Sequence, residues 1–146
     1  MAPTRNSAFP QPFAGRRLVI AAVAFGTLGL GVGIRLGPMP PVWAKYGGVG
    51  LWCALVYWLV LFISPRLAAW MAFLAALGIG CGVELLQLSD IPRTLARSIP
   101  LSKWILGTTF SAPDFPAYAV GAGLAALLHV GLARSLRWEI PRKPMS

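Results

Sequence analysis

Residues 67–83 read LAAWMAFLAALGIGCGV, a run of 17 residues without a single charged side chain. Three similar charge-free runs occupy residues 18–34, 46–65 and 115–133. A helix that crosses the hydrocarbon core of a membrane needs about 20 mostly apolar residues, within a range of roughly 17–25. None of the runs alternates strictly between apolar and polar residues, as the strands of a membrane barrel do, so helices are the expected form. The sequence therefore predicts an all-α integral membrane protein with four transmembrane helices in one bundle, at about residues 18–35, 48–64, 66–88 and 114–133.

The composition of the 146-residue chain favours the same architecture. The chain is 57% hydrophobic and only 12% charged, whereas soluble domains carry about 25% charged residues. A soluble globule, a disordered chain and a coiled coil are excluded because each needs more polar residues. The net charge of +9 would suggest a nucleic-acid partner if the bases formed one face. The bases are spread between the apolar runs instead, so we expect the lipid bilayer, and no nucleic acid, as the partner.

The basic residues also predict an orientation. Four spans put both termini on one side of the membrane, together with eight of the bases, and leave five bases on the other side. The positive-inside rule then predicts a multi-pass protein of the inner (plasma) membrane with both termini in the cytoplasm. The helical domain is expected at residues 17–134, between a disordered tail over residues 1–16 and a basic tail over residues 135–146. Nothing in the sequence indicates an oligomeric state.

The cysteines and the histidine do not suggest a metal or redox site. Cys53 and Cys81 both lie within apolar runs, where each suits a buried packing role. His129 has no familiar metal-ligand spacing to either of them. We therefore predict no metal and no cofactor.

Several glycines within the apolar runs have a spacing that is typical of closely packed membrane helices. Gly29 and Gly33, like Gly78 and Gly82, are separated by three residues, which lets the backbones of two helices approach each other. Gly121 is expected to serve the same purpose. We interpret these residues as packing positions within one bundle, in preference to a homodimer interface.

Polar side chains are predicted to gather at the outer ends of the third and fourth spans. Glu84 lies about 27 Å along its helix from the inner boundary, close to the outer interface of a membrane core about 30 Å thick. Gln87 shares its helix face, and Tyr118 shares a face with Asp114 at the start of the last span. An acid in a membrane helix is costly unless it faces a partner or a wet cavity. The candidate polar cluster therefore consists of Glu84, Gln87, Arg97, Asp114 and Tyr118.

The connection between the third and fourth spans, residues 89–114, supplies further bases. Its prolines prevent one continuous helix, and its apolar residues suit a position at the membrane surface. We therefore expect a partly ordered interfacial loop. Arg93 and Lys103 in this loop are possible additional contacts for an anion.

Several short motifs resemble those of the domain-of-unknown-function 2809 family. They are ELLQ at residues 84–87, Arg97, LGTTF at residues 106–110 and DFPAYAVG at residues 114–121. Residues 29–35 and 46–52 also resemble parts of the family's first two helices, so that the resemblance covers roughly residues 18–133. It implies a small four-helix bacterial inner-membrane protein, similar to VanZ-like proteins, and it brings no established reaction. Val49 stands where the family leads us to expect an acid, which would alter any site that includes such an acid.

Three functional hypotheses follow from the cluster. In the first, a non-enzymatic membrane protein binds an anionic envelope component, such as a lipid or lipid-linked headgroup, through Arg93, Arg97 and Lys103. In the second, the protein is a structural or accessory subunit and the cluster is an ion-pair lock between Glu84 and Arg97. In the third, Glu84 or Asp114 is the general acid or base of a membrane-embedded enzyme that acts on lipid-linked substrates. The sequence contains no Ser–His pair, metal-ligand cluster or nucleophile motif, so no catalytic residue is predicted and the enzyme hypothesis ranks last.

Overall fold

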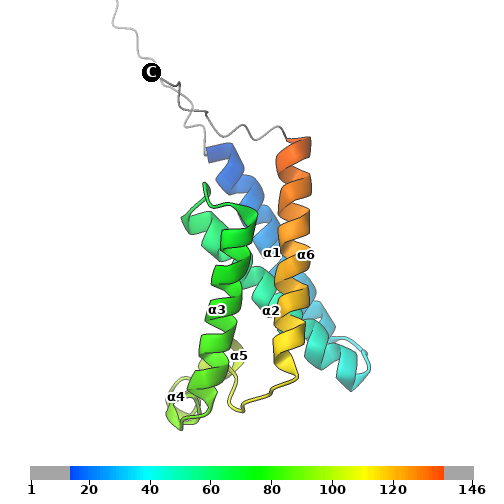
Figure 1. Ribbon diagram of the computed structural model, residues 1–146. Coiled ribbons are helices and arrows are strands. Elements are labelled where there is room, and N and C mark those ends of the chain that lie inside the picture. Colours follow the sequence, from blue (N-terminus) through cyan, green and yellow to red (C-terminus); the bar gives the residue numbers. More distant parts are fainter. Residues whose placement is uncertain (1–13, 137–146) are drawn as a thin grey trace, which may run out of the picture.

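The computed structural model describes residues 14–136, which form six helices in chain order (Figure 1). These are α1 (Ala14–Leu36), α2 (Pro41–Ile63), α3 (Ala69–Gln87), α4 (Ile91–Ser98), α5 (Ser102–Leu106) and α6 (Asp114–Ser135). Helices α1, α2, α3 and α6 are long and apolar enough to cross a membrane. The prediction of an all-α protein with four spans is confirmed, and the chain is a multi-pass membrane protein. Most of the two expected tails lies outside the described residues.

The helices begin and end at different residues from those that the charge-free runs predicted. Helix α1 begins at Ala14, so Arg16 and Arg17 form part of its first turn. Helix α2 begins at Pro41, because a proline at the first helical position has the required φ and needs no hydrogen-bond acceptor. The helix therefore includes Lys45. Lys and Arg are good helix formers, so a charge at the edge of an apolar run does not end a helix.

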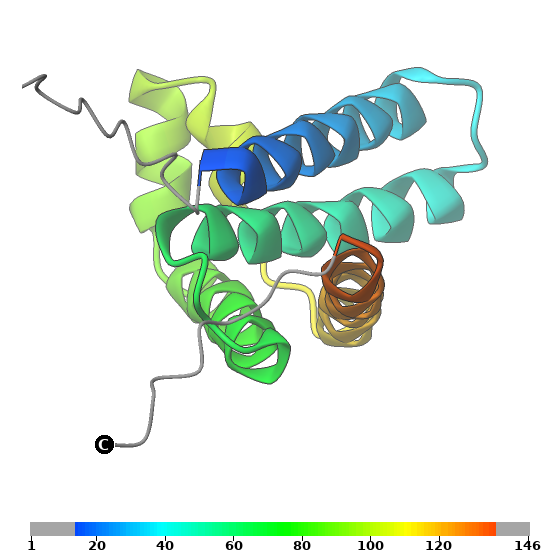
Figure 2. The same cartoon turned by 90° about the horizontal axis from the view of Figure 1, so that it is seen from above.

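Helix α2 lies at the centre of the bundle. It packs against α1, α3 and α6, and α3 also packs against α6. Figure 2 shows α1 and α2 side by side and antiparallel, with α3 and α6 on the other side of α2. Cys53, Tyr57, Trp58 and Leu61 of α2 are each at most 1% exposed, so this helix supplies the largest side chains of the core.

The short helices α4 and α5 lie at one end of the bundle, in the connection between α3 and α6 (Figure 1). The α1–α2 turn lies at the same end, whereas the start of α1, the α2–α3 turn and the end of α6 lie at the opposite end. This arrangement is the one that four successive spans require. The expected interfacial loop is therefore built around two short helices.

The structure corrects the expectation about the paired glycines. A methyl group added at Gly29, Gly33, Gly78 or Gly82 would meet no atom of a neighbouring helix within 4 Å. All four are exposed on the outer surface of α1 or α3. They face outward because other residues form the buried faces of these two helices. The four glycines therefore do not bring the described helices together.

Among the glycines of residues 14–136, the tightest contact between helices is at Gly50 of α2 and Gly121 of α6. A methyl group added at Gly121 would overlap the backbone carbonyl of Gly50. Gly80 of α3 approaches the ring of Tyr118 in a similar way, with only 3.2 Å between the position of an added methyl group and the ring. Only residues without side chains allow α2, α3 and α6 to pack this closely.

A hydrogen-bonded trio joins α1, α2 and α6 at the end of the bundle that holds the start of α1. The ring of His129 lies 2.8 Å from the Tyr57 hydroxyl through Nδ1 and 3.3 Å from Arg16 through Nε2. A guanidinium group can only donate, so Nε2 accepts and Nδ1 carries the ring hydrogen. The Tyr57 oxygen is then the acceptor for His129. This assignment gives His129 a structural role.

Candidate functional site

Glu84 is fully buried near the end of α3, where it joins this helix to α6. Its Oε1 accepts a hydrogen bond of 2.8 Å from the Tyr118 hydroxyl. Its Oε2 accepts a hydrogen bond of 2.9 Å from the backbone N–H of Ser111, in the segment before α6. Two neutral donors thus compensate for the burial of the carboxyl group. Glu84 holds the start of α6 against the end of α3.

Gln87 lies one turn further along α3 and holds α5 in place. Its Nε2 donates a hydrogen bond to the backbone carbonyl of Leu106 at the end of α5. Gly107 follows with φ of 66°, a conformation that favours glycine, and a methyl group there would lie 2.7 Å from this same nitrogen and displace the Gln87 amide. The Oε1 of Gln87 is buried and makes no hydrogen bond with any residue that the structure describes.

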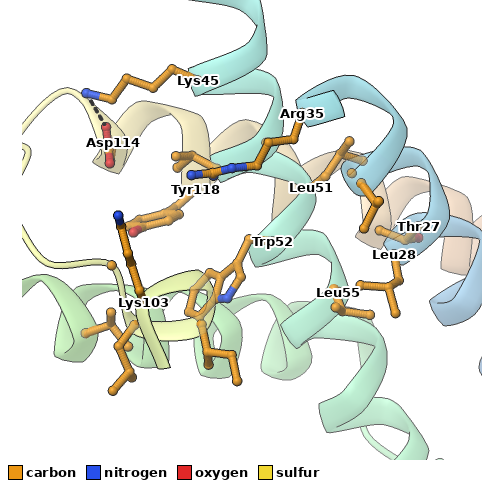
Figure 3. A pocket seen from close by; sticks show the side chains of 18 of the residues that line it. Thr27, Leu28, Arg35, Lys45, Leu51, Trp52, Leu55, Lys103, Asp114 and Tyr118 are labelled. Atoms are coloured by element: carbon orange, nitrogen blue, oxygen red, sulfur yellow. Dashed lines mark ion pairs between the residues drawn. The ribbon is translucent and has the colours of Figure 1, made fainter. Parts of the chain in front are cut away.

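Asp114 begins α6, where a carboxylate is favoured by the positive end of the helix dipole. Its Oδ1 accepts a hydrogen bond of 2.7 Å from the Ser111 hydroxyl and lies 3.5 Å from Nζ of Lys45. Lys45 also donates a hydrogen bond of 3.0 Å to Ser111 Oγ. The ion pair, drawn as a dashed line in Figure 3, therefore links the first part of α2 to the start of α6.

The structure brings together four of the five residues of the predicted cluster. Glu84, Gln87, Asp114 and Tyr118 are all buried at this end of the bundle. Arg97 is exposed on α4 and makes no ion pair or side-chain hydrogen bond within residues 14–136. The expected pairing of Glu84 with Arg97 is therefore absent, because a hydroxyl and a backbone N–H already occupy the Glu84 oxygens.

The basic loop residues take different positions from one another. Arg93 pairs with Asp90 at 3.0 Å on the exposed surface of α4, away from the cluster. Lys103 lies on α5 and lines a pocket beside the cluster. Of the two possible additional anion contacts, Lys103 thus lines a cavity that could hold a ligand.

This pocket has a volume of about 290 Å³ and lies between α1, α2 and α5. Arg35 from α1, Lys45 from α2 and Lys103 from α5 surround its polar end, where Asp114 also contributes. Figure 3 shows the side chains of Arg35 and Lys103 reaching into the pocket from opposite sides, in front of Tyr118. Among the described lining residues, three bases and one acid give a formal charge of +2.

The other end of the pocket is apolar. Leu28 of α1, with Leu51 and Leu55 of α2, forms this part of the wall (Figure 3). Leu28 precedes Arg35 by seven residues, which is about 10 Å along a helix axis. The pocket thus extends from the charged end of the bundle into the apolar part of two spans. Because Leu28 is 46% exposed, the pocket wall continues into the surface that faces lipid.

Two further positions in the pocket wall connect it with the sequence motifs. Trp52 packs against the ring of Tyr118, with 5.8 Å between the ring centroids. Val49, which stands where an acid was expected, also lines the pocket. A carboxylate at this position would lower the formal charge of the lining, so the valine favours an anionic ligand here.

Sequence reasoning did not assign Arg35 and Lys45 to a site. In the sequence they are only two of the five bases that are expected on the outer side of the membrane. Their positions near the end of one span and the start of the next did indicate a common membrane face. The sequence contained no signal that α5 would fold back beside them and close a pocket.

Comparisons with known proteins connect the chain to one family. No curated protein and no solved structure was found to match the chain. Residues 39–122 match a family model described as "Protein of unknown function (DUF2809)". The match covers more than half of the chain and extends from the start of α2 into α6, and it includes Glu84, Gln87 and Asp114. The chain therefore belongs to the DUF2809 family, the one that its motifs resemble.

Proposed function

We propose that this membrane protein binds an anionic lipid headgroup in the pocket between α1, α2 and α5. The observation that carries the proposal is the polarity of that pocket. Arg35, Lys45 and Lys103 converge at one end, and the other end is lined by leucines. Charge-assisted hydrogen bonds from these bases are the interactions that best retain phosphate or carboxylate oxygens.

The depth of the pocket favours a lipid over a soluble anion. Its leucine-lined part lies within α1 and α2, two of the helices that are apolar enough to cross a membrane. A soluble anion would fill only the polar end and leave this apolar surface in contact with water. A lipid would place its headgroup among the bases and its first methylene groups against Leu28 and Leu55, which lowers the apolar area exposed to water.

Glu84 supports the pocket from behind its wall without contacting the proposed ligand. Glu84 does not line the pocket, and both of its oxygens are occupied by Tyr118 and Ser111. Gln87 does line it, and its buried Oε1 makes no hydrogen bond in the described part of the chain.

The proposal extends to the location of the protein. We infer a bacterial inner membrane with both termini in the cytoplasm, so that the pocket opens toward the outer leaflet. The charge asymmetry of the sequence and its resemblance to VanZ-like proteins support this location. Alkaline phosphatase inserted between α4 and α5 should be active, and the same enzyme fused after Ser146 should be inactive. The reverse pattern of activity would overturn the orientation.

Lipid binding can be tested on the purified protein by native mass spectrometry. Phosphatidylglycerol should be retained more strongly than phosphatidylcholine that carries the same acyl chains. Lys103→Ala should weaken the retention of phosphatidylglycerol by about fivefold to tenfold, the loss expected for one partly exposed charge-assisted contact of about 1 kcal/mol or slightly more. Lys103 is exposed on α5, so its substitution leaves the core intact.

Arg97→Ala is the matched control. It removes one positive charge from the same end of the bundle, at a side chain that does not line the pocket. Its effect on the retention of phosphatidylglycerol should be small. Equal losses in the two variants would indicate general attraction of anionic lipid to a basic surface and would refute binding in the pocket.

A further inference from the structure

We infer that the preferred ligand is a lipid phosphomonoester, whose phosphate has three free oxygens, over a lipid phosphodiester. This inference rests on the proposed function and specifies the chemistry of its ligand. Its basis is the juxtaposition of three bases from three separate elements around one small polar space.

The placement of the bases fits three terminal oxygens. Arg35 lies near the end of α1, Lys45 in the first part of α2 and Lys103 in α5, so donors approach the space from different directions (Figure 3). A phosphomonoester offers one oxygen to each base. A phosphodiester has only two oxygens that are free of carbon, so one base would be left without a charged acceptor.

Lys45 can take part in such a site although it already has three partners, one of them the ring of Tyr46, whose centroid lies 5.1 Å from its Nζ. Its ammonium group carries three hydrogens. One is donated to Ser111 Oγ at 3.0 Å, and Asp114 Oδ1 lies 3.5 Å away. The contact with the Tyr46 ring is electrostatic and takes up no conventional hydrogen bond, so one hydrogen remains for a ligand oxygen. Asp114 and Ser111 hold the ammonium group at the edge of the pocket, which lowers the entropic cost of binding.

The charge balance points to the same ligand. The described lining residues carry a formal charge of +2. A phosphomonoester carries about −1.5 to −2 near pH 7, whereas a phosphodiester such as phosphatidylglycerol carries a single negative charge. The monoester therefore comes closer to neutralising a site that has an apolar wall, where an uncompensated charge is most unfavourable.

The size of the pocket limits what can be attached to the phosphate. Its volume of about 290 Å³ lies at the small end of the range for ligand pockets, which is roughly 300–1,000 Å³. A bare phosphate and the first part of one chain suit this volume. A diester adds a second organic substituent at the polar end, where Arg35, Lys45 and Lys103 already surround the space.

The experiment compares two lipids that differ only at the phosphate. Dioleoyl phosphatidic acid, a monoester, and dioleoyl phosphatidylglycerol, a diester, are titrated into the purified full-length protein in detergent, and occupancy is read by native mass spectrometry. At pH 8 we expect phosphatidic acid to bind at least about fivefold more tightly. Lys103→Ala should reduce the binding of phosphatidic acid more than that of phosphatidylglycerol.

A pH series provides a second readout of the same difference. The second proton of a phosphomonoester dissociates near pH 6, so the preference for phosphatidic acid should shrink when the pH falls from 8 to 5. Among the described residues, the charged groups that face the pocket are Arg35, Lys45, Lys103 and Asp114. Phosphatidylglycerol keeps one charge throughout, so its binding reports any change in these protein groups. A preference that does not shrink would overturn the inference.

The outcomes separate this inference from the proposed function. Equal binding of the two lipids, with both weakened by Lys103→Ala, would overturn the monoester preference and leave anionic lipid binding in place. If Lys103→Ala bound both lipids as tightly as Arg97→Ala does, both proposals would be overturned. A third arm adds glycerol 3-phosphate as competitor. Displacement of phosphatidic acid by equimolar glycerol 3-phosphate would show that the chains contribute nothing and would overturn a lipid ligand.

Discussion

Replacement of Tyr118 by phenylalanine tests whether the contact with Glu84 holds α3 and α6 together. The substitution removes only the hydroxyl group that donates to Glu84 Oε1 at 2.8 Å. The ring remains, with its contacts to Trp52 and to the backbone of Gly80. Because Glu84 is 0% exposed, water does not replace the lost donor in the folded protein.

The expected loss of stability follows from that burial. A buried acceptor left without its partner costs about 1–3 kcal/mol, and more when it is charged. Hydrogen bonds between membrane helices contribute less, about 0.6 kcal/mol on average with a maximum near 1.7 kcal/mol. Glu84 is an acid with complete burial and retains only the Ser111 N–H as a donor. We therefore expect Tyr118→Phe to lower the free energy of unfolding by about 2 kcal/mol, up to about a 30-fold change in the unfolding equilibrium.

The measurement is reversible unfolding by sodium dodecyl sulfate in mixed micelles, followed by far-ultraviolet circular dichroism. Tyr46→Phe is the matched control, because the hydroxyl of Tyr46 makes no hydrogen bond with another residue in the range 14–136. The control should change the free energy of unfolding by less than about 0.5 kcal/mol.

A double-mutant cycle with Glu84→Gln isolates the contact. The coupling energy between the two substitutions should be about 1 kcal/mol or more, since residues in one hydrogen bond do not act independently. If Tyr118→Phe matched the Tyr46 control, or if the effects of Tyr118→Phe and Glu84→Gln were additive, the idea that this hydrogen bond stabilises the bundle would be refuted.

Four further substitutions test other features of the fold and the site. Gly121→Ala places a methyl group into the backbone carbonyl of the facing helix and should lower the free energy of unfolding by about 1–3 kcal/mol. Gly78→Ala, whose methyl group meets open space, should instead raise it by roughly 0.5–1 kcal/mol in the same titration. Tyr57→Phe removes the acceptor for the His129 ring and should cost about 1 kcal/mol; an unchanged midpoint would contradict the assigned bond. Lys45→Met should cost less than about 1 kcal/mol, because the ion pair is half exposed, yet it should reduce the retention of phosphatidic acid. If Lys45→Met strongly destabilised the protein but left the retention of phosphatidic acid unchanged, Lys45 would contribute to stability alone and not to lipid binding.

The four spans could be predicted from the sequence because their cause is local. A segment in hydrocarbon must satisfy its own backbone hydrogen bonds and carry few charges, and both conditions can be checked within about 20 residues. The grouping of Glu84 with Gln87, and of Asp114 with Tyr118, follows from helical periodicity for the same reason. Successive spans cross the membrane in opposite directions, so the end of the third span and the start of the fourth lie at the same membrane face. The two pairs are therefore expected at one face.

The partners of these residues could not be predicted. The hypothesis of a structural ion-pair lock paired Glu84 with Arg97, because a buried acid requires compensation and this base was available in the loop. In the structure, Ser111 and Tyr118 compensate for Glu84, and Lys45 pairs with Asp114. Those contacts depend on how α2 meets α6 and on the path of the segment before α6. Neither can be read from spacing along the chain.

The glycines give the clearest division between what the sequence determined and what the tertiary structure decided. The sequence determined that the chain crosses the membrane as four apolar helices and that glycine spacing permits close packing. It did not determine which side of each helix faces inward, because a helix that is apolar all round shows no preferred face when its solvent is also apolar. Packing at Gly50 and Gly121 fixes the rotation of α2 and α6, and the approach of Gly80 to the Tyr118 ring fixes that of α3 and leaves Gly78 on the outer surface. The packing of the helices also makes bases from α1 and α2 line one pocket with Lys103 of α5, so only the tertiary structure forms the charged pocket.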